Sequence, residues 1–288
     1  MTFCEKIARG KFVVTSEIGP PKGVDLKESL DSALLIKDRV DAINVTDLQN
    51  SIMRVGSLSV CHLLKDMGIE PILQMTCRDR NRLALQSDLL SASVLGIENV
   101  LILTGDYISA GDHPEAKGVF DVGSVELLDI ANGLQEGSDM KGNPLKGAPK
   151  FCLGAAVNPG ADPLEPEIIK MEKKIASGAK FFQTQAVFDI ELFKKFIDST
   201  KHLKATVLAG IVLLKSAKMA KYMNENIAGV YVPEGLIKEI DSTDDKSAKS
   251  IEIAARIINQ IKPLCQGIHI MPIGWHKKVP KVLDAAGL

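Results

Sequence analysis

Short apolar runs rich in β-branched residues recur along the chain and alternate with longer amphipathic segments. Eight of the short runs are almost continuously apolar, which is the pattern of a parallel strand buried on both faces. They span residues 12–16, 42–46, 71–76, 99–104, 151–156, 181–184, 206–211 and 267–271. The pattern therefore predicts eight strands of a parallel sheet.

The segments between these runs have apolar residues at a spacing near 3.6, which predicts amphipathic helices. The predicted helices span residues 26–37, 56–67, 80–95, 125–134, 165–177, 191–200, 216–225 and 248–261. Asp162-Pro163 and Asp189 are the predicted start signals of two of them.

Alternation of eight strands with helices predicts an α/β protein with a (β/α)8 TIM barrel. The 288 residues are close to the roughly 250 of one such barrel. We therefore expect a single domain over residues 1–288. The alternative is an open doubly wound sheet, which usually has a G-x-G-x-x-G turn after its first strand. Here Glu17-Ile18-Gly19-Pro20-Pro21 stands in that place.

Two segments have the composition of irregular connections. Residues 106–123 follow the fourth strand at its carboxyl end, where barrel enzymes place their sites. Residues 136–150 precede the fifth strand and are predicted to form a surface connection at the opposite end.

Charge and cysteine content narrow the function classes. With 35 basic and 36 acidic residues the net charge is −1, which argues against a nucleic-acid binder. No run of about 20 apolar residues predicts a membrane helix. No histidine or cysteine spacing indicates a metal site. The scattered cysteines predict free thiols in the reducing cytoplasm. They are Cys4, Cys61, Cys77, Cys152 and Cys265.

Polar residues stand at the ends of six predicted strands, and in a barrel these ends converge on one mouth. A polar strand end also arises simply because it meets water, so the argument rests on the set rather than on any member. The set is Glu17, Thr46, Asp47, Gln74, Thr76, Thr104-Gly105-Asp106, Asn158, Gln183 and Gln185.

Glu17 is the candidate general acid. It follows the apolar run Phe12-Val13-Val14 and precedes the stiff Pro20-Pro21 pair. A partly apolar surrounding favours the protonated form of a carboxyl group, which can then donate a proton near neutral pH. The alternative is an ion pair with a Lys or Arg of a neighbouring strand.

Asp106 and Gln185 are candidate contacts for a heterocycle. Gly105 lets a ligand approach the backbone, and the adjacent carboxylate can accept bonds from ring N–H groups. The Gln185 amide can pair with a donor–acceptor edge. An ordinary turn and an ordinary strand end are the alternatives. Lys170, Lys173 and Lys174 form either a solvated face or a phosphate site.

Taken in order, several short motifs resemble the methylenetetrahydrofolate reductase family, over nearly the whole chain. The first is Val14-Thr15-Ser16-Glu17-Ile18-Gly19-Pro20-Pro21, which is similar to the family's opening S-F-E-F-x-P-P. The others are Val45-Thr46, Gln74-Met75-Thr76-Cys77, Leu103-Thr104-Gly105-Asp106, Gln183-Thr184-Gln185-x-x-Phe188-Asp189, Ala209-Gly210-Ile211, Val232-Pro233 and Gly267-Ile268-His269.

The resemblance implies a flavin-binding (β/α)8 barrel, with FAD favoured over FMN. The implied reaction reduces 5,10-methylenetetrahydrofolate to 5-methyltetrahydrofolate by hydride transfer from reduced flavin N5 to the 5-iminium form. It also implies roles for individual residues. Glu17 is the implied general acid, Asp106 lies beside the flavin pyrimidine edge and the pterin, and Gln185 contacts the pterin.

Further contacts follow from the same resemblance. Met223 occupies the position of an aromatic residue that contacts the pterin or nicotinamide, and Tyr222 is adjacent to it. The implied flavin contacts are Thr46, Gln74, Thr104, Gly105, Asp106, Phe120, Asp121, Asn158, Glu167, Lys173 and Lys174.

The sequence departs from the family's pattern at several positions. Gln74 and Asn158 replace histidines, Thr104 replaces an arginine, and Met223 replaces an aromatic residue. The electron donor therefore stays open between NAD(P)H and a partner protein, and the substrate between tetrahydrofolate and a related pterin. Two alternatives to the reductase remain: a pterin-binding methyl carrier or methyltransferase without redox activity, and a flavin subunit active only with a partner. Members of this family are often homo-oligomers, so the resemblance implies a homo-oligomer as well. For a family member of 288 residues we also expect no regulatory domain and no separate nicotinamide domain.

Overall fold

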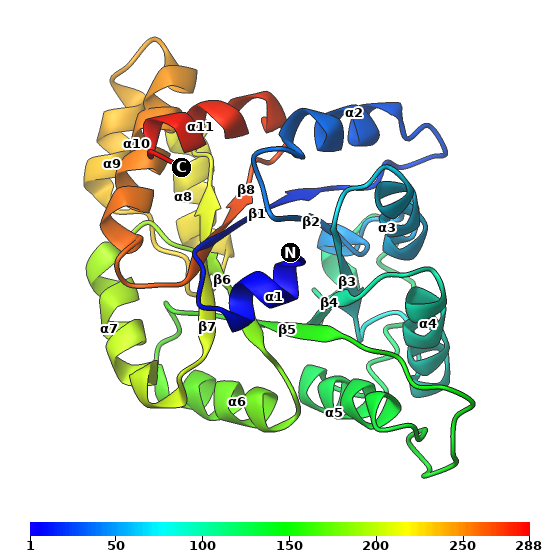
Figure 1. Cartoon of the computed structure of the whole chain (residues 1–288). Helices are drawn as coiled ribbons and strands as arrows, with labels where there is room; N and C mark the ends of the chain where they lie inside the picture. Colours follow the sequence, from blue (N-terminus) through cyan, green and yellow to red (C-terminus); the bar gives the residue numbers. More distant parts are fainter.

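Eight parallel strands close into a barrel in sequence order in the computed structural model, which describes residues 1–288. Each strand pairs with its sequence neighbours, and β1 closes the ring against β8 (Figure 1). The strands are β1 Val13–Ile18, β2 Ala42–Val45, β3 Pro71–Thr76, β4 Asn99–Leu103, β5 Cys152–Val157, β6 Phe181–Ala186, β7 Thr206–Val212 and β8 Gly267–Met271. The predicted (β/α)8 barrel is confirmed.

Each predicted strand is present, with ends within two residues of those expected from the apolar runs. The largest differences lie at the carboxyl ends of β1 and β6, which run two residues further than predicted. Ladder pairing continues there despite polar side chains, and Glu17 pairs in register with Asn44 of β2. Glu17 thus lies inside a strand, which fixes its backbone.

The helices form the outer layer, and the eight predicted ones are present. They are α2 Lys27–Ile36, α3 Ser57–Asp66, α4 Arg82–Val94, α5 Ser124–Gln135, α6 Glu165–Ala176, α7 Ile190–Thr200, α8 Ala217–Asn226 and α10 Lys246–Ile261. Short 3-10 turns complete the connections at η1 Gln49–Ser51, η2 Ile108–Ala110, η3 Lys201–Leu203 and η4 His276–Lys278. Asp189 caps α7 by accepting from Leu192 N at 2.9 Å, as predicted. Asp162-Pro163 precedes α6 as predicted, although Leu164 is the residue at the N-cap and makes no side-chain cap.

Three further helices were not predicted: α1 Phe3–Ala8, α9 Glu234–Asp241 and α11 Val279–Ala285. They have six, eight and seven residues, too few for a periodicity of 3.6 to stand out. Helix α11 follows β8 and gives the last strand its helix.

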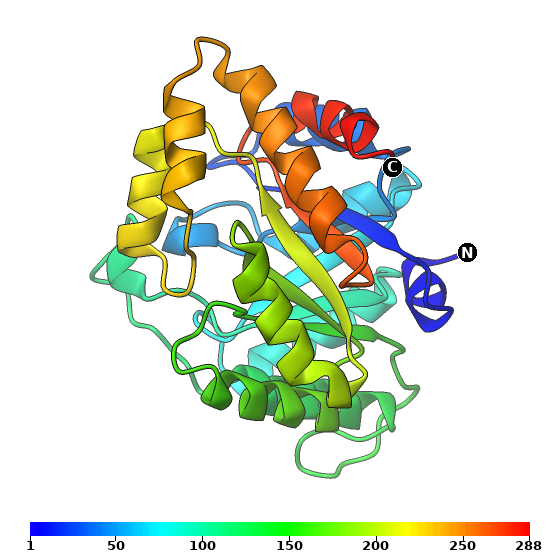
Figure 2. The same cartoon turned by 90° about the vertical axis from the view of Figure 1, so that its left-hand side faces the viewer.

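The two ends of the barrel differ. Helix α1 lies across the opening at the amino ends of the strands (Figure 1), and Phe3 stacks edge-on against Phe181 with ring centroids 5.2 Å apart. The connection after β4 lies at the opposite end (Figure 2). Residues 106–123 and 136–150 are irregular connections at opposite ends, as predicted. No helix has both the length and the apolar character that a membrane span requires.

Candidate active site

The interior of the barrel changes from apolar to polar along its axis. At the closed end an apolar floor packs together Phe3, Ile7, Val13, Ala42, Ile72, Leu101, Cys152, Phe181 and Leu208. Side chains two residues apart in a strand point to the same face, so Thr15 and Glu17 follow Val13 into the interior. The strands thus carry a polar layer above the apolar floor.

Four side chains of this polar layer form one hydrogen-bonded chain across the barrel. The amides of Asn44 and Gln183 bond each other twice, at 2.8 and 3.1 Å. Gln183 Nε2 also donates to Thr15 Oγ1 at 3.3 Å, and Thr15 Oγ1 lies 2.9 Å from His269 Nδ1. All four residues are buried. Gln183 therefore lies below the mouth, where its amide is used within the protein.

Glu17 lies beside this row of hydrogen-bonded side chains, next to His269. It is 9% exposed, and its Oε2 lies 3.5 Å from His269 Nε2. The neighbouring ionisable group is thus a histidine rather than the lysine or arginine weighed as the alternative. The Thr15 contact at Nδ1 orients the imidazole so that Nε2 faces the carboxyl group. The Glu17 carboxyl group and the His269 imidazole therefore face each other inside the barrel.

His276 contacts the main chain of Glu17. Its Nε2 donates to the Glu17 main-chain carbonyl at 3.1 Å. Burial lowers the pKa of His276 below its ordinary value, while the bond to Glu17 opposes that shift. The sequence did not predict either histidine as a neighbour of Glu17, although His269 belongs to the family-like motif Gly267-Ile268-His269.

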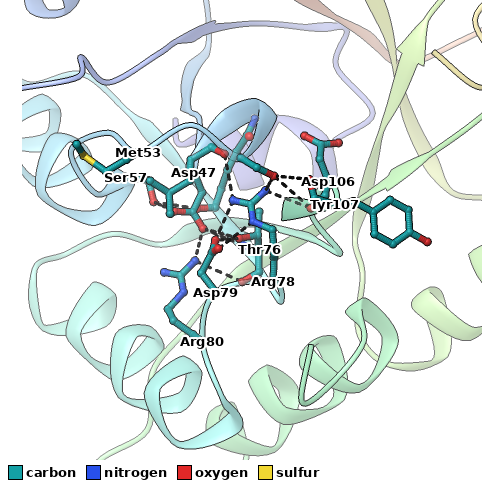
Figure 3. A network of polar contacts seen from close by, with 12 residues as sticks. Asp47, Met53, Ser57, Thr76, Arg78, Asp79, Arg80, Asp106 and Tyr107 are labelled. Atoms are coloured by element: carbon teal, nitrogen blue, oxygen red, sulfur yellow. Dashed lines mark hydrogen bonds and ion pairs between the residues drawn. The ribbon is translucent and has the colours of Figure 1, made fainter. Parts of the chain in front are cut away.

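Two buried polar atoms that follow β2 and β3 lack a hydrogen-bond partner, Thr46 Oγ1 and Arg80 Nε. Thr46 Oγ1 is buried and has no hydrogen-bond partner, and a Cβ added at Gly19 would come 3.6 Å from it. Asp47, by contrast, is fully engaged: it accepts from Thr76 N at 2.9 Å, from the Ser57 and Thr76 hydroxyls, and from Arg80 (Figure 3). Gln74 is buried, and its main-chain carbonyl accepts from Ser57. The Thr46 hydroxyl thus has hydrogen-bonding capacity that no protein group uses.

The end of β4 presents Asp106 to the mouth. Gly105 has φ +94°, and a Cβ there would come 3.0 Å from the Arg78 side chain, so both conformation and space require glycine. Thr104 bonds Ser124 at 3.3 Å through their hydroxyls. The Asp106 main-chain carbonyl accepts from the Arg78 guanidinium at 3.5 Å, whereas the residue is exposed (Figure 3).

A change of register at the end of β6 exposes Gln185. Pairing of β6 with β7 shifts between Gln183 and Ala186, and Gln185 is the one exposed residue of the strand. Thr184 Oγ1 fills the irregularity by accepting from Gly210 N at 2.9 Å and donating to Gln185 O at 2.7 Å. Such irregularities re-aim side chains near sites.

The residues expected at a flavin's phosphates are mostly engaged within the protein. Asn158 donates to Ala228 O at 2.9 Å, and Glu167 accepts from Asn158 N at 3.0 Å. Lys174 is buried and donates to Ala156 O at 2.7 Å, and burial lowers its pKa. Lys173 is exposed.

The remaining predicted contacts divide between core and surface. Met223 is 3% exposed and belongs to the hydrophobic core, while Tyr222 beside it on α8 is 60% exposed. Phe120 is partly exposed. Asp121 forms two bonds of 2.8 Å to Arg82, whose guanidinium lowers the pKa of this carboxyl to about 2.

Comparison with protein families gives one assignment for the chain. Residues 2–287 match the methylenetetrahydrofolate reductase family. The chain is 24% identical to methylenetetrahydrofolate reductase 2 of Schizosaccharomyces pombe over 99% of its own length but only 47% of the relative's. It is 23% identical to the 5,10-methylenetetrahydrofolate reductase of Escherichia coli, covering 86% of this chain and 80% of that one. The chain thus spans about half of the fungal relative and most of the bacterial one.

Solved structures share the fold. A protein from Clostridium thermocellum that binds two copies of 5-methyl-5,6,7,8-tetrahydrofolic acid aligns with a TM-score of 0.70 and 19% identity. The alignment covers 98% of this chain and 96% of that protein. The long-chain alkane monooxygenase LadA aligns with a TM-score of 0.58 and 11% identity over 96% of this chain. At these identities the likeness establishes the barrel alone.

Proposed function

The chain belongs to the methylenetetrahydrofolate reductase family, and from this membership we propose that it reduces 5,10-methylenetetrahydrofolate to 5-methyltetrahydrofolate with the help of a bound flavin. The observation that carries the proposal is the buried Glu17 carboxyl, 3.5 Å from His269 Nε2, at the base of the mouth. This pair supplies a proton donor where the ends of the strands converge.

Two features of the mouth support a bound flavin. Thr46 Oγ1 is a buried hydroxyl that lacks a partner, and flavin rings present both donors and acceptors along their pyrimidine edge. Gly105 leaves the backbone open beside the exposed Asp106. When bound, a flavin supplies the hydride that the reduction requires. Among the lysines of α6, Lys170 and Lys173 are exposed and could contact the phosphates of the cofactor. From the family membership we propose FAD rather than FMN as the cofactor.

In the proposed reaction Glu17 moves the proton. Its carboxyl group donates to N10 of the folate, and the bond from N10 to the methylene carbon breaks. The methylene group remains on N5 as an iminium cation, and a hydride added to that carbon completes the methyl group. His269 then faces the carboxylate left on Glu17 and stabilises its charge. General acid catalysis of this kind contributes roughly 10²- to 10⁴-fold to a rate.

Asp106 and Gln185 are proposed to hold the pterin. Both are exposed at the mouth, Asp106 just after β4 and Gln185 in β6, where a carboxylate and an amide can bond the ring's N–H groups and carbonyl. The exposed ring of Tyr222 is the nearest counterpart in sequence to the family's aromatic contact, because Met223 faces the core.

The experiment that tests this function is a visible absorption spectrum followed by anaerobic reduction. The purified protein should be yellow and should bleach when NADH, NADPH or reduced viologen is added. Added methylenetetrahydrofolate should then restore the oxidised spectrum. The donor that bleaches the protein also decides between a nicotinamide and a partner protein as the source of electrons. A flavin-bound protein that methylenetetrahydrofolate leaves reduced would contradict the proposal.

A second function is folate binding without redox chemistry. The Clostridium thermocellum protein with the same fold binds two copies of 5-methyltetrahydrofolate, which supports a mouth that holds pterins alone. This alternative predicts a colourless, folded protein with affinity for methyltetrahydrofolate and none for flavin. Calorimetric titration with each ligand separates the two functions.

A further inference from the structure

Arg78 joins three loops of the mouth through its guanidinium group. It follows β3 and is 1% exposed, yet each of its five N–H donors has an acceptor. Two bonds of 2.9 and 2.8 Å go to the Asp79 carboxylate, which neutralises the buried charge. The others go to Leu48 O at 3.0 Å, Ser51 Oγ at 3.0 Å and Asp106 O at 3.5 Å (Figure 3).

The loop after β2 has an unfavourable backbone that needs such support. Leu48, Asn50 and Ser51 all have positive φ values, of 46°, 56° and 57°. Non-glycine residues persist in this region only where their surroundings fix them. Arg78 bonds the first and the last of the three. The guanidinium therefore holds the loop in its conformation.

The loop after β4 rests on the same group. Ser51 Oγ donates to Tyr107 O at 2.9 Å, and Val119 N donates to Arg78 O at 2.7 Å. A Cβ added at Gly111 would come 1.9 Å from Ser51 O, so the two loops are in direct contact. Figure 3 shows the Asp106 carbonyl facing the guanidinium and its carboxylate directed away. The backbone of Asp106 is thus fixed while its carboxylate stays available.

We propose that Arg78 is a positioning residue that sets the place of the Asp106 carboxylate at the mouth. The fork geometry matters as well as the charge, because a lysine ammonium has three donors on one nitrogen and cannot replace the five bonds that spread from three nitrogens of the guanidinium. The proposal rests on the proposed function in one respect: Asp106 is taken as a contact of the pterin and the flavin.

The test compares Arg78→Lys with Asp106→Asn and with the double variant. A displacement of about 1 Å at a site costs on the order of 100-fold, so we expect Arg78→Lys to lower kcat/KM for methylenetetrahydrofolate by about that factor, with much of the loss in KM. If Arg78 acts through Asp106, kcat/KM of the double variant is little lower than that of the less active single variant. Arg256→Lys is the matched control, because Arg256 makes a similar two-bonded pair with Glu239 on the outer helices.

Hydrogen exchange gives a second readout that needs no activity. The amides of Ala110 and Gly111 are hydrogen-bonded within the loop after β4. They should exchange faster in Arg78→Lys and at the wild-type rate in Arg256→Lys. If Arg78→Lys fails to fold, Ser51→Ala takes its place, because it removes one acceptor of the guanidinium with little change in volume. Exchange of the same amides should again be faster.

The outcomes separate the claims. Unchanged exchange in Arg78→Lys and in Ser51→Ala would overturn the positioning role whatever the activity. Losses that multiply in the double variant would show that Arg78 does not act through Asp106. A wild-type protein that reduces no folate would refute the proposed function instead, and the exchange result alone would then decide whether Arg78 fixes the loop.

Discussion

Cys4 and Cys152 bring two thiols together at the floor of the barrel, far from the mouth. A hydrogen bond from Cys152 lowers the pKa of the half-buried Cys4 thiol to about 7. Burial has the opposite effect on other cysteines and raises the pKa of Cys77 to about 12 and that of Cys265 to about 11. The five cysteines therefore differ in reactivity, since the thiolate is the nucleophile.

We expect iodoacetamide at about pH 7.5 to alkylate Cys4 before the four buried cysteines. Replacing the hydrogen-bond donor in Cys152→Ala should slow the labelling of Cys4, because its thiolate loses a stabilising bond. Peptide mass spectrometry after timed quenching measures both. Labelling of Cys77 or Cys265 ahead of Cys4 in the native protein would contradict this assignment.

His276 gives the protein a pH dependence of stability in a defined range. Burial lowers its pKa in the folded state, so between that value and the ordinary value of about 6.5 the unfolded chain binds more protons. Stability contributed by this site is therefore present above about pH 6.5 and falls as the solution is acidified. The carboxyl of Asp121, with its pKa lowered to about 2, loses its contribution only at much lower pH.

Urea unfolding at several values between about pH 7.5 and pH 5 measures this effect. The wild type should lose unfolding free energy over the range, and His276→Gln should lose less, because glutamine keeps an N–H donor for Glu17 O without titrating. Identical slopes for the two proteins would assign the pH dependence to other groups.

At the scale of elements, the register shift between β6 and β7 controls where Gln185 points. Gly210 makes the shift possible, because a Cβ there would come 2.5 Å from Thr184 O and 2.8 Å from Gln185 O. Gly210→Ala should lower the unfolding free energy by about 1–3 kcal/mol and weaken folate binding as the strand end moves. Gly235→Ala on α9 is the control, since nothing lies within 4 Å of its added Cβ and it should change stability by no more than about 1 kcal/mol.

The strands and the long helices could be predicted because each shows its own period in the local sequence. Strand ends such as Glu17 and Asp106 were also predictable, since parallel strands bring their carboxyl ends together. The polar layer inside the barrel could not be predicted. Whether Asn44 faces the interior depends on register, and the contact of Thr15 with His269 joins residues 254 apart, on the first and last strands. Arg78 was missed because a charged run after a strand ordinarily indicates solvent exposure, and only the fold encloses it.

At the scale of the whole molecule, the barrel has an apolar closed end and a polar mouth, which is the proposed place of reaction. Helix α1 closes the first with Phe3, which is fully buried against Phe181. Phe3→Ala should cost about 3–5 kcal/mol in unfolding free energy, whereas Leu83→Ala, at a side chain 75% exposed, should cost little. Folded Phe3→Ala should keep its ligand affinity, and a loss of affinity in the folded variant would contradict this division.

The central claim is that Glu17 supplies the proton for folate reduction, and the rate at which methylenetetrahydrofolate reoxidises the reduced flavoprotein tests it most directly. Glu17→Gln keeps the size of the side chain but cannot donate as an acid, and Glu191→Gln on the exposed face of α7 is the control. Stopped-flow absorbance under anaerobic conditions should show an unchanged flavin spectrum in all three proteins. The account predicts that reoxidation slows by roughly 10²- to 10⁴-fold in Glu17→Gln alone. Reoxidation of Glu17→Gln at the wild-type rate would contradict it.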